Sequence, residues 1–213
     1  MMKKALCTLA LLGAAATSQA GVLVSQNFNN VAALGAGWVM TNNSTPAGST
    51  GWGQGSPEVF TAHQGAENSY ISANYNNAAP GGMIDNWLIT PVFSTALGAT
   101  ITFWMRADKA EDYFDMVSFG LSDGSSNTID FNLDPSFVVN TDGWAKYTIS
   151  IANQAPGSTA RFAINYNGLA DEANYIGIDT LQIAEVPEPA SLLLLGTGLA
   201  GLIASRRRRQ RAA

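Results

Sequence analysis

The middle of the chain alternates between apolar and polar residues over short stretches and has almost no helical periodicity. In one stretch Ile101, Phe103 and Met105 fall on the same side of an extended backbone. The same alternation predicts strands at residues 22–28, 70–75, 87–93, 100–106, 116–121, 128–133, 144–151, 161–166 and 175–183. Turn-rich stretches separate them about every ten residues. Residues 21–185 are therefore predicted to form one all-β domain, an antiparallel β-sandwich.

Several segments between the predicted strands have the composition of turns or loops. Residues 77–82, 122–125 and 140–143 are rich in Asn, Asp, Ser and Gly and are predicted to be turns. Residues 41–57 are rich in Gly, Ser, Asn and Pro, so we predict a long loop there without strands.

The first 20 residues have the features of a secretory signal peptide. Two lysines precede an apolar stretch at residues 5–16, and small residues place a cleavage site between Ala20 and Gly21. We predict a signal helix that signal peptidase and the general secretion machinery process. Cys7, the one cysteine, would be removed with it, so the exported part would hold no disulfide.

The last residues combine an apolar run at 190–204 with an arginine cluster. At about 1.5 Å per residue the run reaches about 22 Å, short of a hydrocarbon core of about 30 Å, so it predicts a single transmembrane helix that tilts or thins the bilayer. The positive-inside rule keeps the arginines in the cytoplasm. The cytoplasmic stop consists of Arg206, Arg207, Arg208 and Arg209. The alternative, a core helix followed by a nucleic-acid-binding arginine run, fits poorly with the export signal.

Residues 186–213 resemble the PEP-CTERM sorting signal, since Val-Pro-Glu-Pro, the apolar run and the arginines follow in that order. In that family a membrane protease-transpeptidase, exosortase, recognises the tail in Gram-negative bacteria that make exopolysaccharide. The resemblance implies that Pro187, Glu188 and Pro189 are the recognition element. It also implies a transient inner-membrane anchor, followed by release to the cell surface or exterior.

The predicted exported part is strongly acidic. Residues 21–186 carry 15 of the 16 acidic residues but only four of the 11 basic ones, which gives a net charge of −11, whereas the whole chain has −5. Such a surface repels nucleic acid. Its negative charge is suited to binding a divalent cation, or it only keeps the protein soluble. We therefore expect no nucleic-acid partner.

The exported part also resembles the choice-of-anchor J domains, which are related to the cleaved-adhesin and MAM-like jelly rolls. The resemblance lies in Asn27 with Phe28, Gly37 with Trp38, and segments 70–75, 85–91, 102–106 and 175–179. Its most specific block is Asp-Asn-Trp-Leu-Ile-Thr-Pro at residues 85–91. It implies a jelly-roll β-sandwich with an extracellular binding or structural role and without a shared catalytic site.

Some of these relatives hold a structural calcium ion between the first and last strands, which draws attention to Asp179. Strand parity allows its carboxylate to point inward, where it needs a cation or several N–H donors. Asn27 and Asn29 are the nearby candidate ligands, although Asn29 stands where relatives often have an acidic residue. A calcium ion at Asp179 and a hydrogen-bonded structural aspartate both stay open.

The densest acidic group is formed by Asp108, Glu111, Asp112 and Asp115. On a strand, Glu111 and Asp115 would share a face but lie about 13 Å apart, which is too far for a pair of glycosidase carboxylates. We therefore predict a solvated loop in place of a catalytic pair, with a weak cation site left open. The alternative enzyme class is a polysaccharide-active jelly-roll enzyme with two carboxylates that converge from different strands.

One histidine and two tryptophans are the remaining candidates for chemistry or binding. His63, the one histidine, is predicted to be solvated in a loop, so a catalytic triad is not expected. Trp52 lies in the glycine-rich loop and is predicted to be displayed, while Trp104 lies opposite the apolar face of its strand and either packs in a second layer or is exposed. Both are candidate glycan contacts, with core packing as the alternative.

These features together predict an exported, non-enzymatic surface or matrix protein. We expect exosortase to sort and cleave it, and we expect an adhesive, glycan-binding or structural role in exopolysaccharide or biofilm.

Overall fold

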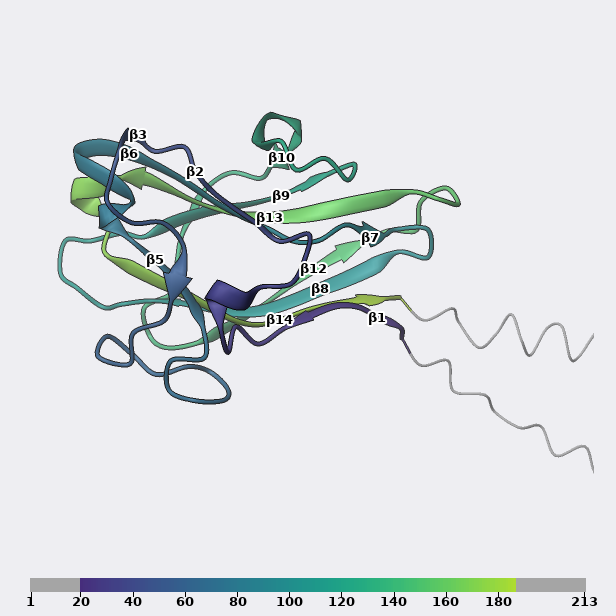
Figure 1. Cartoon of the computed structure of the whole chain (residues 1–213), viewed down its shortest axis with the longest axis horizontal. Helices are drawn as coiled ribbons and strands as arrows, with labels where there is room; N and C mark the ends of the chain where they lie inside the picture. The colour runs from purple at the N-terminus through teal and green to yellow at the C-terminus, as the bar shows by residue number, and fades with distance from the viewer. Residues whose placement is uncertain (1–19, 187–213) are drawn as a thin grey trace, which may run out of the picture. The chain divides into compact units, whose positions relative to one another are not determined.

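The computed structural model describes residues 20–186, whose strands form two antiparallel sheets that face each other (Figure 1). The first sheet has the order β12 (Ala145–Ile151), β8 (Ala99–Ala107), β14 (Tyr175–Glu185), β5 (Ile71–Asn74) and β4 (Gly53–Gln54), with β1 (Val22–Gln26) on β14. The second sheet has the order β10 (Asn132–Leu133), β9 (Met116–Ser122), β13 (Thr159–Leu169), β6 (Ala78–Ile89) and β2 (Val39–Asn42). Three short strands extend it: β11 (Phe137–Val138) on β9, β3 (Thr45–Ala47) on β6, and β7 (Phe93–Ser94) on β13. The predicted all-β antiparallel sandwich is confirmed.

Short 3-10 helices complete the described part. They are η1 (Val31–Ala33), η2 (Tyr75–Asn77), η3 (Thr128–Asp130) and η4 (Ala170–Glu172). Between residues 20 and 186 no helix has the length and apolar character needed to cross a membrane. The predicted signal helix, transmembrane helix, Pro-Glu-Pro element and arginine cluster lie outside the described residues.

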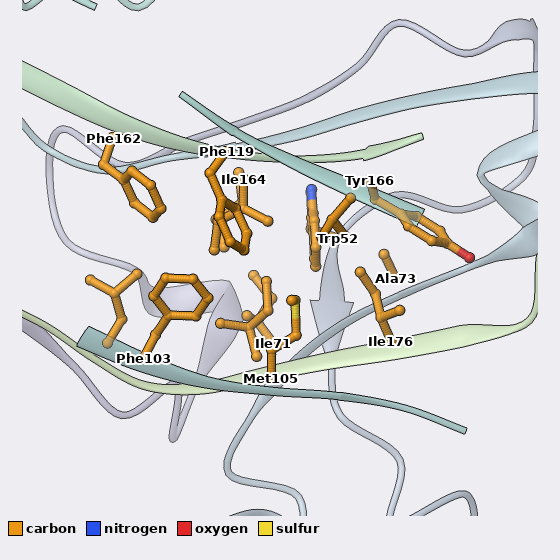
Figure 2. Close-up of a cluster of buried hydrophobic side chains, with 14 of the residues drawn as sticks. Trp52, Ile71, Ala73, Phe103, Met105, Phe119, Phe162, Ile164, Tyr166 and Ile176 are labelled. Atoms are coloured by element: carbon orange, nitrogen blue, oxygen red, sulfur yellow. The ribbon is translucent and has the colours of Figure 1, made fainter. Parts of the chain in front are cut away.

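The core fills the space between the sheets and follows the alternation of the sequence. Along β8 every second residue is buried, and Ile101, Phe103 and Met105 are fully inaccessible. The ring of Phe103 lies 5.1 Å from that of Phe119 on β9 and 5.7 Å from that of Phe162 on β13, measured between centroids (Figure 2). These contacts join the two sheets, because β8 belongs to the first sheet and the other two strands belong to the second.

All but one of the predicted strands are present. Most ends shift by at most a few residues, but the strand predicted at 87–93 corresponds to β6, which begins at Ala78 and ends at Ile89. The predicted strand at residues 128–133 is wrong: its first half is η3, and only β10 remains of it. Ser125 accounts for the turn, because its hydroxyl donates to the Asp130 carboxylate at 2.6 Å and accepts from the backbone N–H of Asn127 at 3.1 Å. Local side-chain bonds of this kind favour a turn over an extended ladder.

Two segments predicted without strands contain them. Residues 78–82, predicted as part of a turn, begin the long strand β6, and the predicted loop 41–57 contains the end of β2, then β3 and β4. The β6–β3 ladder is irregular, and Gly81 has a φ of +72°. The glycine-rich composition that predicts a turn therefore belongs here to an irregular strand. Asn42 fixes the supposed loop by donating to the carbonyl oxygens of Thr50 and Asn77.

Strand β14 sets the long dimension of the sandwich. It spans 11 residues, or roughly 33 Å, from Tyr175 to Glu185. At its far end Glu185 N donates to Gly21 O, so both ends of the described part leave from the same end of the sandwich (Figure 1). Helix η4 directly precedes β14 and therefore lies at the opposite end.

Candidate functional site

A pocket of about 570 Å³ opens at the end of the sandwich that is opposite both chain exits. Helices η2 and η4, the start of β6 and the loop before β9 surround it. Its lining consists of Tyr75, Asn76, Ala78, Pro80, Tyr113, Ala170, Asp171, Ala173 and Asn174. This volume lies within the range of small-molecule sites.

Small side chains give the pocket its depth, and two tyrosines form its rim. Ala78, Ala170 and Ala173 are buried, and their methyl groups leave room above them. The rings of Tyr75 and Tyr113 are 47% and 45% exposed, although aromatic side chains gain most from burial. They come from segments far apart in the sequence, which the sandwich brings to one opening.

A buried carboxylate holds the loop that carries Tyr113. Asp115 is only 3% exposed, and it accepts hydrogen bonds from the Tyr166 hydroxyl at 2.5 Å, Asn174 N at 2.8 Å and Tyr175 N at 3.2 Å. Burial raises the pKa of Asp115 above its usual value, and the three hydrogen bonds oppose that rise. The prediction that Asp115 lies in a solvated loop is wrong, because its donors come from β13 and from the η4–β14 junction, far along the sequence.

Further bonds tie the same loop to η4. Phe114 N donates to Glu172 O at 2.7 Å, and the Asn174 amide donates to the Asp108 carboxylate at 3.0 Å. The predicted exposure of Glu111 and Asp112 is confirmed. Residues 20–186 contain no group of three or more His, Cys, Asp or Glu side chains that could hold a metal ion.

The polar groups of the pocket are mostly acceptors. Asp171 is the only carboxylic acid of the lining, and the lining has no Lys, Arg or His. One Asp171 oxygen accepts from Gly81 N at 2.9 Å, and within residues 20–186 the other makes no hydrogen bond. In the same residues no hydrogen bond is made by the Asn76 side chain or by the side-chain oxygen (Oδ1) of Asn174, so these atoms can bind a ligand.

The predicted display of Trp52 is wrong. Its side chain is 8% exposed and belongs to the core, and Figure 2 shows it between the layer with Ile164 and the layer with Met105. The pairing of β4 with β5 draws the preceding Trp52 inward, which composition could not indicate. In the described part of the chain the indole nitrogen of Trp52 is buried without a hydrogen-bond partner.

Trp104 lies on the outer face of the first sheet, but it is half-buried. The ring of His63 stacks on it with a centroid distance of 3.9 Å and an interplanar angle of 16°. The imidazole ring of His63 therefore forms a second layer that covers one face of the Trp104 indole. The predicted solvated position of His63 is therefore wrong, because the residue is half-buried against Trp104.

Asp179 is fully buried, and its surroundings consist of donors. One carboxylate oxygen accepts from Gln64 N at 2.9 Å, and the other accepts from Thr180 N at 2.6 Å and the Thr180 hydroxyl at 3.2 Å. Burial raises its pKa, and these bonds oppose the rise. No hydrogen bond joins Asp179 to Asn27 or Asn29 in the described residues. Donors around a carboxylate do not fit calcium, which needs six to eight oxygens.

The sequence did not predict this pocket, because the residues that line it have no distinctive pattern in the sequence. Tyr75 stands at the end of a predicted strand, and Tyr113 stands in an acidic loop. Only the exposure of two large aromatic residues in turn-like segments could have marked them, and the sequence does not give exposure.

Comparison with known proteins confirms the predicted PEP-CTERM sorting motif. A model of the PEP-CTERM protein-sorting motif matches residues 185–209, so the chain carries this sorting signal. No curated protein gives a significant match to the sequence.

Solved structures with a similar fold include adhesin domains. The K1 cleaved adhesin domain of Lys-gingipain from Porphyromonas gingivalis W83 has a TM-score of 0.61 at 18% identity, covering 78% of this chain and 99% of that domain. The K3 domain of the same protein has a TM-score of 0.58 at 20% identity, covering 78% and 99%. An arabinose-bound α-L-arabinofuranosidase has a TM-score of 0.50 at 14% identity, covering 78% of this chain and 26% of that enzyme. These likenesses establish the cleaved-adhesin type of sandwich fold.

Proposed function

We propose that this chain is an exported, non-enzymatic binding module of the cell surface or extracellular matrix. The observation that carries the proposal is the position of the pocket, roughly 33 Å along β14 from the residue that leads into the sorting tail. Because the pocket lies far from the end of the domain where the tail begins, attachment or cleavage at the tail leaves the pocket open. Proteins commonly carry binding residues on loops at the end of a rigid scaffold.

Delivery follows from the two ends of the chain. The secretion machinery exports it, signal peptidase cuts between Ala20 and Gly21, and the apolar run holds it in the inner membrane with Arg206–Arg209 in the cytoplasm. Exosortase then recognises Pro187, Glu188 and Pro189 and cleaves nearby. The matched sorting motif supports this order of events.

Binding fits the pocket better than catalysis does. Glycoside hydrolysis ordinarily needs two carboxylic acids that flank the scissile bond, and Asp171 alone among the lining residues is a carboxylic acid. The open volume, the two exposed tyrosines and the free side-chain amide of Asn76 are typical of a recognition site. The target expected for an exported protein of this type is the exopolysaccharide or biofilm matrix around the cell.

Intact mass and co-sedimentation test this proposal. Protein from the surface and culture medium of the native host should begin at Gly21, end near Pro187 and sediment with the host's exopolysaccharide. A protein that still contains the arginine tail contradicts the exosortase step. Cleavage of the polysaccharide by the purified protein would instead support the alternative, a polysaccharide-active enzyme.

A further inference from the structure

The two rim tyrosines give the pocket flat, apolar surfaces that water covers in the free protein. Tyr75 leaves η2, and Tyr113 leaves the loop that Asp115 anchors, so neither belongs to the core. A ligand with its own apolar face, such as the C–H face of a pyranose ring, would remove these surfaces from water.

The hydrogen-bonding groups beside the tyrosines call for a ligand with many donors. The second oxygen of Asp171 and the side-chain oxygen (Oδ1) of Asn174 accept only, and the side-chain amide of Asn76 both donates and accepts. Sugar hydroxyl groups match this set, since each can donate to a carboxylate or amide oxygen and also accept from an amide N–H.

The charge of this end of the sandwich excludes anionic ligands. Asp171 lines the pocket, Asp108 bonds the lining residue Asn174, and Glu172 follows Asp171 in η4. The only basic residue of the adjoining loop, Lys109, lies 3.9 Å from the exposed carboxylate of Asp142 and does not line the pocket. A uronate or phosphate group would therefore meet repulsion without a compensating cation.

The pocket walls are already fixed before a ligand arrives. The hydrogen bonds that the Asp115 carboxylate accepts from Tyr166, Asn174 and Tyr175 hold the loop to the core. Little ordering entropy is then lost on binding, which helps weak stacking and hydroxyl contacts to give measurable affinity.

We infer that the Tyr75–Tyr113 pocket binds a hexopyranose unit without an anionic group, an inference that rests on the proposed binding function. The rings of Tyr75 and Tyr113 stack on the sugar, Asp171 and Asn174 accept from its hydroxyl groups, and Asp171 repels uronates. An amino sugar, with its ammonium group, satisfies the same chemistry.

Titration calorimetry on the processed protein tests the inference with four probes: oligosaccharides of neutral hexoses, of glucosamine and of hexuronate, and a lysine-rich peptide. We expect the first or second probe to bind, the third not to bind, and Tyr75→Ala and Tyr113→Ala each to weaken binding about tenfold. Tyr75→Phe, which keeps the ring, should lose less. Ile129→Ala, at a side chain 83% exposed and outside the pocket lining, is the control and should bind normally.

The variant Asp171→Asn tests the selectivity directly. Its amide oxygen can still accept from Gly81 N, so the fold is kept while the charge is lost, and hexuronate binding should rise relative to neutral binding. This inference is overturned, while the proposed function stands, if sugar binding survives in both tyrosine variants. The same conclusion follows if the unaltered protein prefers hexuronate or the peptide. Failure to bind any of the saccharides or the host's exopolysaccharide overturns both.

Discussion

The hydroxyl group of Tyr166 donates a hydrogen bond of 2.5 Å to the carboxylate of Asp115. Tyr166 is fully buried on β13, and Asp115 holds the loop that forms one side of the pocket. Burial raises the pKa of Tyr166 well above its usual value, so the phenol stays a donor throughout the physiological range. One buried bond thus connects the core to the wall of the candidate site.

The stability of the protein should fall as pH rises above the unfolded pKa of about 3.8 and passes through the folded pKa values of two buried aspartates. Burial raises the pKa values of Asp115 and Asp179, so at intermediate pH the folded state binds more protons than the unfolded state does. Their contribution to the free energy of unfolding is complete below the unfolded pKa of about 3.8 and is lost as pH passes through the folded pKa values. Urea denaturation across this range measures the slope.

The variant Asp115→Asn should flatten that slope, because the substituted side chain does not titrate. Its amide oxygen can still accept from Tyr166 and Asn174, but its NH₂ group would face the Tyr175 N–H, so the variant should also be less stable at low pH. Glu111→Gln, at an exposed position of the same loop, is the matched control and should keep the slope of the unaltered protein. An unchanged slope in Asp115→Asn would show that another group titrates.

Replacement of Trp52 should affect folding and leave ligand contact intact. Trp52→Ala removes a core side chain, so the free energy of unfolding should drop by about 3–5 kcal/mol. Trp52→Phe should cost less. Chemical denaturation gives these values, and titration of the folded fraction gives binding. Lost binding at unchanged stability would restore Trp52 as a ligand contact.

The alternation of the sequence was enough to predict most strands and their inner faces. A strand with one buried face must repeat its apolar residues every second position, as Ile101, Phe103 and Met105 do. The Asp-Asn-Trp-Leu-Ile-Thr-Pro block at residues 85–91 has a structural role, because Asp85 joins it to β13. The Asp85 carboxylate accepts from the Trp87 indole and from the side-chain amide of Asn165, each at 2.6 Å.

The burial of particular polar and aromatic residues could not be predicted in this way. Asp115 stands among acidic neighbours that are exposed, and only its donors on distant elements explain its burial. Likewise, Tyr75 and Tyr113 meet at the rim of the pocket only because the sheet topology brings their segments together. Local composition gives no information about such long-range partners.

Substitution of Gly177 should destabilise the sandwich. A Cβ atom at this position of β14 would lie 2.8 Å from ring atoms of both Phe60 and Tyr70. Tyr70 is fully buried and donates to the Ser56 and Phe60 carbonyl groups, so it cannot move away easily. Gly177→Ala should therefore lower the free energy of unfolding by about 1–3 kcal/mol, measured by urea denaturation.

The control for this substitution is Gly51→Ala. No atom lies within 4 Å of a Cβ built at Gly51, so this change should be neutral or slightly stabilising through the unfolded state. Equal stability of the two variants would mean that Phe60 and Tyr70 yield to the added methyl group.

Removal of calcium should leave the protein unchanged, because Asp179 is satisfied by N–H and O–H donors. The melting temperature in excess EDTA should match that in calcium within about 1 °C. Asp179→Asn should lower the melting temperature in both solutions, since its NH₂ group would face either Gln64 N or Thr180 N. Asn29→Ala serves as the control for one of the two other predicted ligands and should show no calcium dependence. If EDTA lowers the melting temperature, calcium restores it and Asp179→Asn abolishes the response, then Asp179 is a calcium ligand and the hydrogen-bonded arrangement is wrong.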